Sequence, residues 1–229
     1  MILTFIIAVI PTIVLGYFVY KKDILEKEPI GLITTLFCLG TAIILPAIIL
    51  ENVITLILPI TSNEILNCFT LSFFCVALVE EGLKASMAYE IAWRNKNFNH
   101  IYDGIVYCVF TSLGFATLEN ILYVFTYGNM TGILRAIVSV PGHAFFGVTM
   151  GYYMGFAKYN EHIADNSKKT RNILLSILLP IVFHGLFDFL LLTNNQLMII
   201  IFFIFVLVLY IISYLKIRKL SKVMNMLPQ

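Results

Sequence analysis

Residues 197–210 read LMIIIFFIFVLVLY, an uninterrupted apolar run with no charged residue and no alternation of polar and apolar positions. Blocks of this kind recur along the chain at about twenty residues each, the length that spans a bilayer core as an α-helix. The chain of 229 residues is 60% hydrophobic and 12% charged, whereas a soluble domain has about 25% charged residues. A transmembrane barrel would instead need alternating segments of about ten residues. The sequence therefore predicts an all-α, polytopic membrane helix bundle.

Seven membrane-spanning helices are expected, and residues 1–229 are expected to form a single transmembrane domain. All but two of the 15 lysine and arginine residues lie in the segments 21–29, 91–103 and 158–171 or in the C-terminal tail, and the alternate segments 51–65, 128–131 and 193–195 contain none. Because basic residues concentrate in cytoplasmic loops, this distribution predicts an N-out/C-in topology. The predicted helices cover residues 2–20, 30–50, 66–90, 104–127, 132–157, 172–192 and 196–216.

Charge and cysteine content exclude several other classes of function. The net charge of +2 provides no basic face for nucleic acid, so no nucleic-acid partner is expected. The apolar spans make the lipid bilayer of a cell membrane the expected surroundings. The four cysteines are scattered without a C-x-x-C pair, and we expect them to pack as small apolar residues rather than to bind metal or form disulfides.

Ionisable side chains interrupt four of the predicted spans, although a charge near the bilayer centre costs about 3 kcal/mol. Counting about 1.5 Å per residue from the outer end of each helix places them at a common depth in the middle to outer half of the membrane. We therefore expect one shared site within a core of residues 66–192. The ionisable residues are Glu80, Glu81 and Lys84 in the third span, Glu119 in the fourth, His143 in the fifth, and His184 and Asp188 in the sixth, and the polar Asn120 follows Glu119.

The spacing within these groups adds geometry. Lys84 follows Glu80 by four residues and Glu81 by three, so its ammonium can pair with either carboxylate on one helix face. A neighbouring cation favours the ionised form of a carboxylate, which burial alone would disfavour. His184 and Asp188 are also four residues apart, so the aspartate can accept the ring N–H and fix the tautomer of the histidine.

These groups suit hydrolysis of a peptide bond within the membrane. Such a reaction needs a base for water, an electrophile for the carbonyl oxygen and an acid for the leaving amine. Glu80 or Glu81 is the candidate base, and Asn120 is a candidate for orienting a neighbouring group. Glu119, His143 and His184 form a set of two histidines and one carboxylate, as in catalytic zinc sites with an open position. No G-x-S-x-G nucleophile motif is present.

Four motifs resemble those of the PrsW family of bacterial intramembrane proteases. They are EE-x-x-K at 80–84, DGIVY at 103–107 leading into GFA-x-x-EN at 114–120, PGH-x-x-x-G at 141–147, and HG-x-x-D at 184–188. The related CAAX prenyl endopeptidases and bacteriocin-processing proteins have E-E-x-x-x-R. Here Lys84 comes one residue earlier than that arginine, and Glu119 stands where the wider group has histidine, so PrsW is favoured.

The resemblance implies a stress-response protease of the bacterial plasma membrane. It implies site-1 cleavage of a single-span anti-sigma factor near its extracytoplasmic side. The paired glutamates and the last histidine of the family map to Glu80, Glu81 and His184. The resemblance leaves open whether the enzyme is a metalloprotease or a glutamate protease.

Three alternatives to a protease remain. The polar residues could relay protons in a transporter, they could bind a peptide in a non-enzymatic immunity protein, or they could form a structural network. An immunity protein would tolerate glutamine at Glu80 and Glu81, whereas a protease would not tolerate loss of its base.

Other polar and small residues are expected to have ordinary structural roles. We expect Arg135 to anchor a helix at the membrane interface, Asp103 to be a solvated helix cap, and His100 to lie in a solvated loop. A stripe of glycines at 147, 151 and 155 is expected to let a neighbouring helix approach closely.

Overall fold

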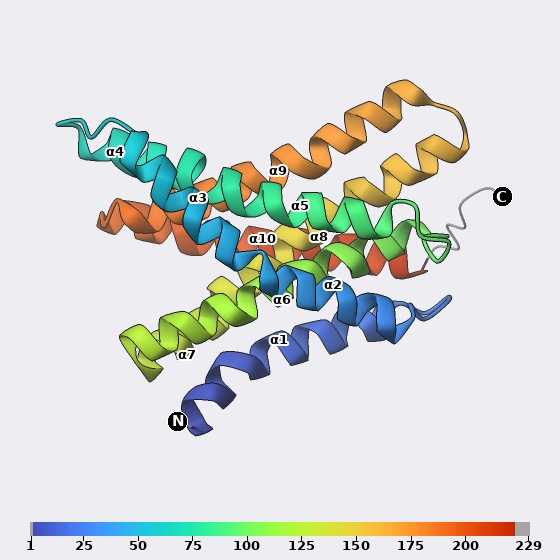
Figure 1. The fold of residues 1–229 in the computed structure, drawn as a ribbon, viewed down its shortest axis with the longest axis horizontal. Coiled ribbons are helices and arrows are strands. Elements are labelled where there is room, and N and C mark those ends of the chain that lie inside the picture. The colour runs from blue at the N-terminus through green and yellow to red at the C-terminus, as the bar shows by residue number, and fades with distance from the viewer. Residues whose placement is uncertain (1, 223–229) are drawn as a thin grey trace.

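The computed structural model describes the backbone of residues 2–222 and the side chains of residues 5–221, and every regular element in this part of the chain is helical. Seven segments are long and apolar enough to cross a membrane, which confirms the predicted polytopic bundle. The elements, shown in Figure 1, are α1 (Ile2–Lys22), α2 (Ile30–Ala42), α3 (Ile44–Ile57), α4 (Glu64–Thr70), the π-helix η1 (Leu71–Ala77), α5 (Leu78–Ala92), α6 (Ile101–Tyr127), α7 (Asn129–Ile137), α8 (Ser139–His162), α9 (Asn166–Leu192) and α10 (Gln196–Lys222).

Three predicted spans consist of more than one helix. The second span is interrupted at Ile43 and continues as α3 to Ile57, seven residues beyond the predicted end. Pro46 lies in the first turn of α3, where its missing N–H is tolerated because first-turn amides have no partner within the helix. The third span contains the π-helix η1 immediately before α5, which carries Glu80 and Glu81. Short π-helical segments within α-helices are frequent at functional sites.

The fifth span begins with the short helix α7, which continues into α8 after a break at Val138. The chain passes from α6 to α7 through the single residue Gly128, whose φ of 89° lies in the left-handed region that favours glycine. This sharp turn brings α7 back against the outer part of α6.

Helices α6 and α8 form the centre of the bundle, and their backbones approach closely (Figure 1). A Cβ atom on Gly151 would collide with the backbone of Gly104, and one on Gly155 would collide with the carbonyl group of Ile101. The predicted packing role of the glycine stripe is therefore confirmed. The close contact fixes the relative position of α6 and α8, which carry Glu119 and His143.

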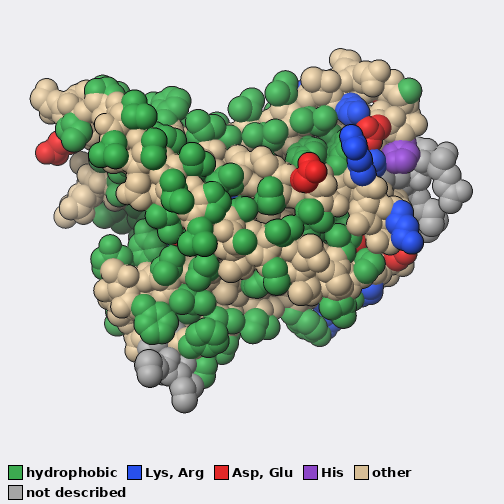
Figure 2. All heavy atoms as spheres, in the orientation of Figure 1, with side chains coloured by type: hydrophobic (Ala, Val, Ile, Leu, Met, Phe, Trp, Pro, Cys, Tyr) green, Lys and Arg blue, Asp and Glu red, His purple; other side chains and the backbone are tan. Residues whose placement is uncertain are grey.

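Basic side chains gather at one end of the bundle, where the connections between α1 and α2, α5 and α6, and α8 and α9 lie (Figures 1 and 2). Figure 2 shows mostly apolar side chains along the middle of the visible face. This arrangement is the one that the N-out/C-in prediction requires, although the direction of insertion itself stays a prediction.

Two residues at this basic end differ from their predicted environment. His100 was expected in a solvated loop but is 5% exposed, and Asp103 was expected to be solvated but is fully buried. Asp103 lies in the first turn of α6, where its Oδ2 accepts hydrogen bonds from the backbone N–H groups of Asn99 at 2.9 Å and His100 at 2.6 Å. The aspartate therefore caps the helix from inside the protein.

Candidate functional site

A cavity of about 480 Å³ lies between α3, the η1–α5 segment, α6, the α7–α8 segment and α9. It lies in the half of the bundle opposite the basic end, because its walls include the C-terminal half of α6 and the last turn of α9. Five of the predicted site residues contribute to its walls, as the common-depth argument predicts. They are Glu80, Glu119, His143, His184 and Asp188.

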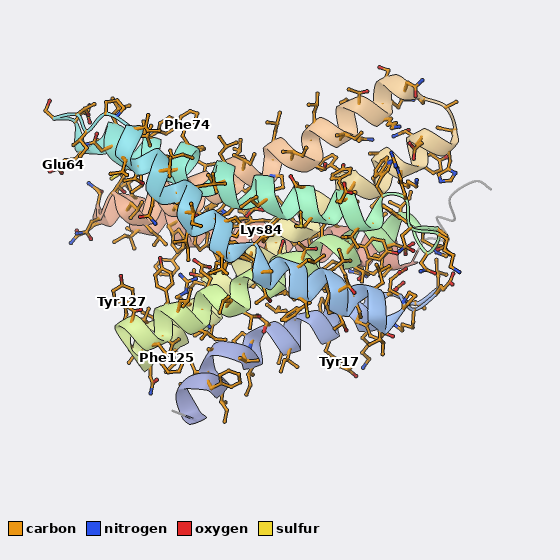
Figure 3. All side chains as sticks on the ribbon, in the orientation of Figure 1. Tyr17, Glu64, Phe74, Lys84, Phe125 and Tyr127 are labelled. Carbon is orange, nitrogen blue, oxygen red and sulfur yellow. The ribbon has the colours of Figure 1, made fainter. Side chains whose placement is uncertain are left out.

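Lys84 lies in the middle of the bundle (Figure 3), and its side chain contacts three of the predicted site residues. Its fully buried ammonium lies 2.9 Å from Glu80 Oε2, 2.8 Å from Glu81 Oε1 and 3.1 Å from His143 Nδ1. It also lies 4.1 Å from the centre of the Phe115 ring. The predicted pairing with either glutamate is thus a pairing with both, and two buried carboxylates share one cation.

His184 is held from both sides of its ring. Its Nδ1 lies 3.0 Å from Glu81 Oε1, and its Nε2 lies 3.4 Å from Asp188 Oδ2. The ring also stacks on Phe146 with 4.9 Å between centroids. The i,i+4 spacing of His184 and Asp188 therefore brings the two side chains together as predicted, and the imidazole has a defined orientation.

The two adjacent glutamates differ in their access to the cavity. Glu80 is 5% exposed and borders the cavity, whereas Glu81 is fully buried and does not. One oxygen of Glu81, Oε2, has no hydrogen-bond partner. Glu80 is therefore the glutamate that water or substrate in the cavity can reach. Glu81 does not border the cavity and contacts Lys84 and His184.

Arg135 lines the cavity, and whether it also lies at the membrane interface stays a prediction. Its guanidinium lies 2.7 Å from Glu119 Oε2, as an ion pair without an aligned hydrogen bond, and 3.9 Å from the centre of the Tyr123 ring. The same oxygen of Glu119 lies 2.8 Å from His143 Nε2. Sequence spacing could not find this pair, because the arginine comes from α7 and its carboxylate partner from α6.

Glu51 and Asn120 also differ from their predicted positions. Glu51 was placed in an outer loop, but α3 continues past it and the residue lines the cavity. Asn120 was included among the catalytic candidates, but its side-chain amide donates to the carbonyl oxygen of Ala8 at 3.0 Å. The structure therefore directs Asn120 towards α1 and does not bring it together with the other site residues.

The group of side chains close enough to share a metal ion differs in part from the predicted ligand set of Glu119, His143 and His184. Glu80, Glu81, His143 and His184 each offer a ligand atom within 4.8 Å of the others, and Glu119 is not in this group. Histidine and carboxylate are ligands that zinc takes, and the unpartnered oxygen of Glu81 is free to act as a metal ligand. The residues fit a zinc ion by type and spacing, with the ammonium of Lys84 as its competitor for the same atoms.

Comparison with known proteins identifies the family. The profile of the PrsW family intramembrane metalloprotease matches residues 28–214, which include every predicted site residue. The chain belongs to the PrsW family. It is 33% identical to "Protease PrsW" of Clostridioides difficile (strain 630), over 96% of this chain and 91% of that protein. It is 38% identical to "Protease PrsW" of Oceanobacillus iheyensis and 35% identical to that of Bacillus subtilis (strain 168), in both cases over 79% of each chain. No solved structure gives a significant match.

PrsW membership and the seven spans make the chain a multi-pass intramembrane protease of a bacterial membrane. The transporter and immunity-protein alternatives are therefore set aside. A membrane substrate and the surrounding lipid are the partners consistent with this family.

Proposed function

We propose that this PrsW protease cuts a single-span membrane protein near its extracytoplasmic side, with Glu80 as the base that activates water. One observation carries the proposal. The Glu80 carboxylate borders the cavity and is held 2.9 Å from the fully buried ammonium of Lys84. A carboxylate beside a buried cation and open to the cavity is placed to take a proton from water there.

Glu80 takes a proton from water as the water oxygen attacks the scissile carbonyl carbon. The same carboxyl then gives this proton to the amide nitrogen as the carbon–nitrogen bond breaks, so that one new acid and one new amine are formed. Glu81 and Asp188 hold the His184 ring towards the cavity. Arg135, which also borders the cavity, is a cation near the negative charge that develops on the carbonyl oxygen.

His143, His184 and Glu81 are the proposed ligands of a zinc ion, leaving Glu80 as the base. This gives the two histidines and one carboxylate of many catalytic zinc sites. When bound, zinc would polarise the scissile carbonyl and activate water. His143 would bind through Nδ1, which now contacts Lys84, or through Nε2, which now contacts Glu119, so zinc would replace one of these two contacts.

An anti-sigma factor is the proposed substrate, and site-1 cleavage the proposed step, on the strength of the family resemblance. The position of the cavity, opposite the basic end, supports a cut near the extracytoplasmic side if the N-out/C-in prediction holds. An intact helix keeps its amides in internal hydrogen bonds, so the substrate must unwind at the cut. Flexible or small residues are expected there.

The decisive experiment measures cleavage of a single-span substrate by the purified full-length protease in detergent. Glu80→Gln should reduce cleavage by about 10²- to 10⁴-fold, the range expected for loss of a general base. Glu90→Gln is the matched control, because Glu90 lies on the same helix but is exposed. Cleavage by the Glu80 variant at the wild-type rate would overturn the assignment of the base.

Metal content tests the ligands separately, by mass spectrometry of the same preparations. Zinc should be close to stoichiometric in the wild type, lost in His143→Ala and His184→Ala, and retained in Glu119→Gln. Zinc loss with Glu119→Gln would favour the ligand set that the sequence predicted. Cleavage that persists without metal but requires Glu80 would show that carboxylates alone activate the water.

A further inference from the structure

Three buried carboxylates meet at the basic end of the bundle. The protease cavity lies in the opposite half, and none of the three residues lines it. Asp23 and Glu28 come from the connection between α1 and α2, and Asp103 from the first turn of α6. One oxygen of each lies within 4.8 Å of the other two. The three residues are 3%, 2% and 0% exposed, so water does not screen their mutual repulsion.

The three carboxylates form no ion pair with a lysine or arginine side chain in the part of the chain whose side chains the structure describes. The ammonium of Lys27 donates instead to the backbone carbonyl groups of Tyr20 and Asp23. His100 Nδ1 lies 3.9 Å from Asp103 Oδ2, but burial lowers the pKa of His100, so its imidazole is neutral near pH 7.

The hydrogen bonds of the cluster leave two buried oxygens unused. The Tyr107 hydroxyl donates to Glu28 Oε2, and Asp103 Oδ2 accepts the two backbone N–H groups at the start of α6. Asp23 Oδ2 and Asp103 Oδ1 have no partner. A buried acceptor without a partner loses its hydration and gains nothing in return. A cation bound between the three carboxylates would give both oxygens a partner.

Protons are the alternative neutralising partner for these groups. Burial raises the pKa of Asp23 to about 6 and that of Glu28 to about 7. At neutral pH, protons therefore leave negative charge on Asp23 and on part of the Glu28 population. A bound cation would remove this cost and use the free oxygens.

The geometry points to a binding site for a hard divalent cation of the Ca²⁺ or Mg²⁺ class, formed by Asp23, Glu28 and Asp103. Such ions take oxygen ligands, above all carboxylates. The all-oxygen donor set distinguishes this site from the histidine-containing group at the protease cavity. The ion links the connection between α1 and α2 to the first turn of α6, the helix that carries Glu119.

Terbium luminescence tests the site without a protease assay. Tb³⁺ is a probe for oxygen-ligand cation sites, and Tyr107, which donates to Glu28, is placed to sensitise its emission. We expect saturable emission from the purified full-length protein in detergent, displaced by Ca²⁺ or Mg²⁺. Glu28→Gln and Asp23→Asn should each weaken Tb³⁺ affinity by about tenfold or more. Glu26→Gln should keep it, because Glu26 has the same charge in the same connection but is exposed.

Thermal unfolding gives a second readout. At a hundredfold excess over the dissociation constant, Ca²⁺ or Mg²⁺ should raise the unfolding temperature of the wild type by roughly 5–10 °C, and should not raise that of Glu28→Gln. Emission that persists in Glu28→Gln would overturn the site. A second pair of results would also overturn the site: millimolar Ca²⁺ or Mg²⁺ does not change the unfolding temperature of the wild type, and Glu28→Gln and Asp23→Asn have the same unfolding temperature as the wild type at pH 8. The carboxyl groups would then hold protons only.

Discussion

The adjacent glutamates of the protease site should fail in different ways when each is changed to glutamine. Glu81 is fully buried, and its Oε1 contacts Lys84 at 2.8 Å and His184 at 3.0 Å. Glu80 contacts the same lysine at 2.9 Å and borders the cavity. Glutamine keeps the shape of the side chain but removes its charge, so the two variants differ chiefly in how much stability each loses.

The two stability losses follow from these contacts. A hydrogen bond to a charged group contributes about 1.5–3 kcal/mol, so the two contacts of Glu81 sum to about 3–6 kcal/mol. Breaking a buried ion pair usually costs about 3–5 kcal/mol, and we use this narrower range. For a chain of this size, 1 kcal/mol lowers the unfolding temperature by about 2–4 °C. Glu81→Gln should therefore lower it by roughly 6–20 °C, and Glu80→Gln by about half as much because it loses one contact.

Thermal unfolding in detergent and initial cleavage rates, measured well below both unfolding temperatures, check this expectation. Glu80→Gln should remain folded and lose cleavage by about 10²- to 10⁴-fold. Glu90→Gln, exposed on the same helix, should match the wild type in both measurements. The reasoning is refuted if Glu80→Gln lowers the unfolding temperature more than Glu81→Gln does, or if it cleaves normally.

Three further predictions concern the cavity, the helix packing and the carboxylate cluster. Arg135→Gln removes the cation beside a cavity carboxylate, so initial rates should fall by about 10- to 100-fold in a folded protein; unchanged rates would exclude a role in the reaction. Gly155→Leu places a side chain against the backbone of α6 and should lower the unfolding temperature by roughly 5–10 °C. Gly31→Leu is the control, because Gly31 is at an open position, and it should not lower the unfolding temperature. Equal losses in the two variants would contradict the packing argument. The folded-state pKa values of Asp23 and Glu28, about 6 and about 7, exceed the ordinary values of 3.8 and 4.5. The folded state therefore binds more protons, and thermal scans with a chelator should show their stability contribution falling as pH rises from about 4 to about 7 and then levelling off; a rise over this range would count against it.

Much of the site could be predicted from the sequence because its motifs are local. Lys84 reaches both glutamates, and His184 reaches Asp188, through spacings of three or four residues on one helix. The common depth of the polar residues followed from counting helical rise. The break between α2 and α3 was missed because both helices are apolar, and this error placed Glu51 outside the membrane core.

Contacts between helices were beyond such counting. The pairing of Arg135 with Glu119 was not expected, and it arises because the turn at Gly128 brings α7 back over α6. Asn120 is adjacent to Glu119 and was grouped with it, but successive residues on a helix point about 100° apart. Its amide therefore contacts α1 instead.

The sequence by itself determined the membrane architecture, the basic end of the bundle and the inventory of ionisable groups within the spans. These are one-dimensional properties, since bilayer thickness sets segment length and helical rise sets depth. The tertiary structure decided which glutamate faces the cavity, which groups gather around Lys84, and which three carboxylates meet at the basic end. Those outcomes depend on the rotation and tilt of each helix against its neighbours. Packing contacts such as the glycine seam between α6 and α8 set these angles, and no pattern within a single segment encodes them.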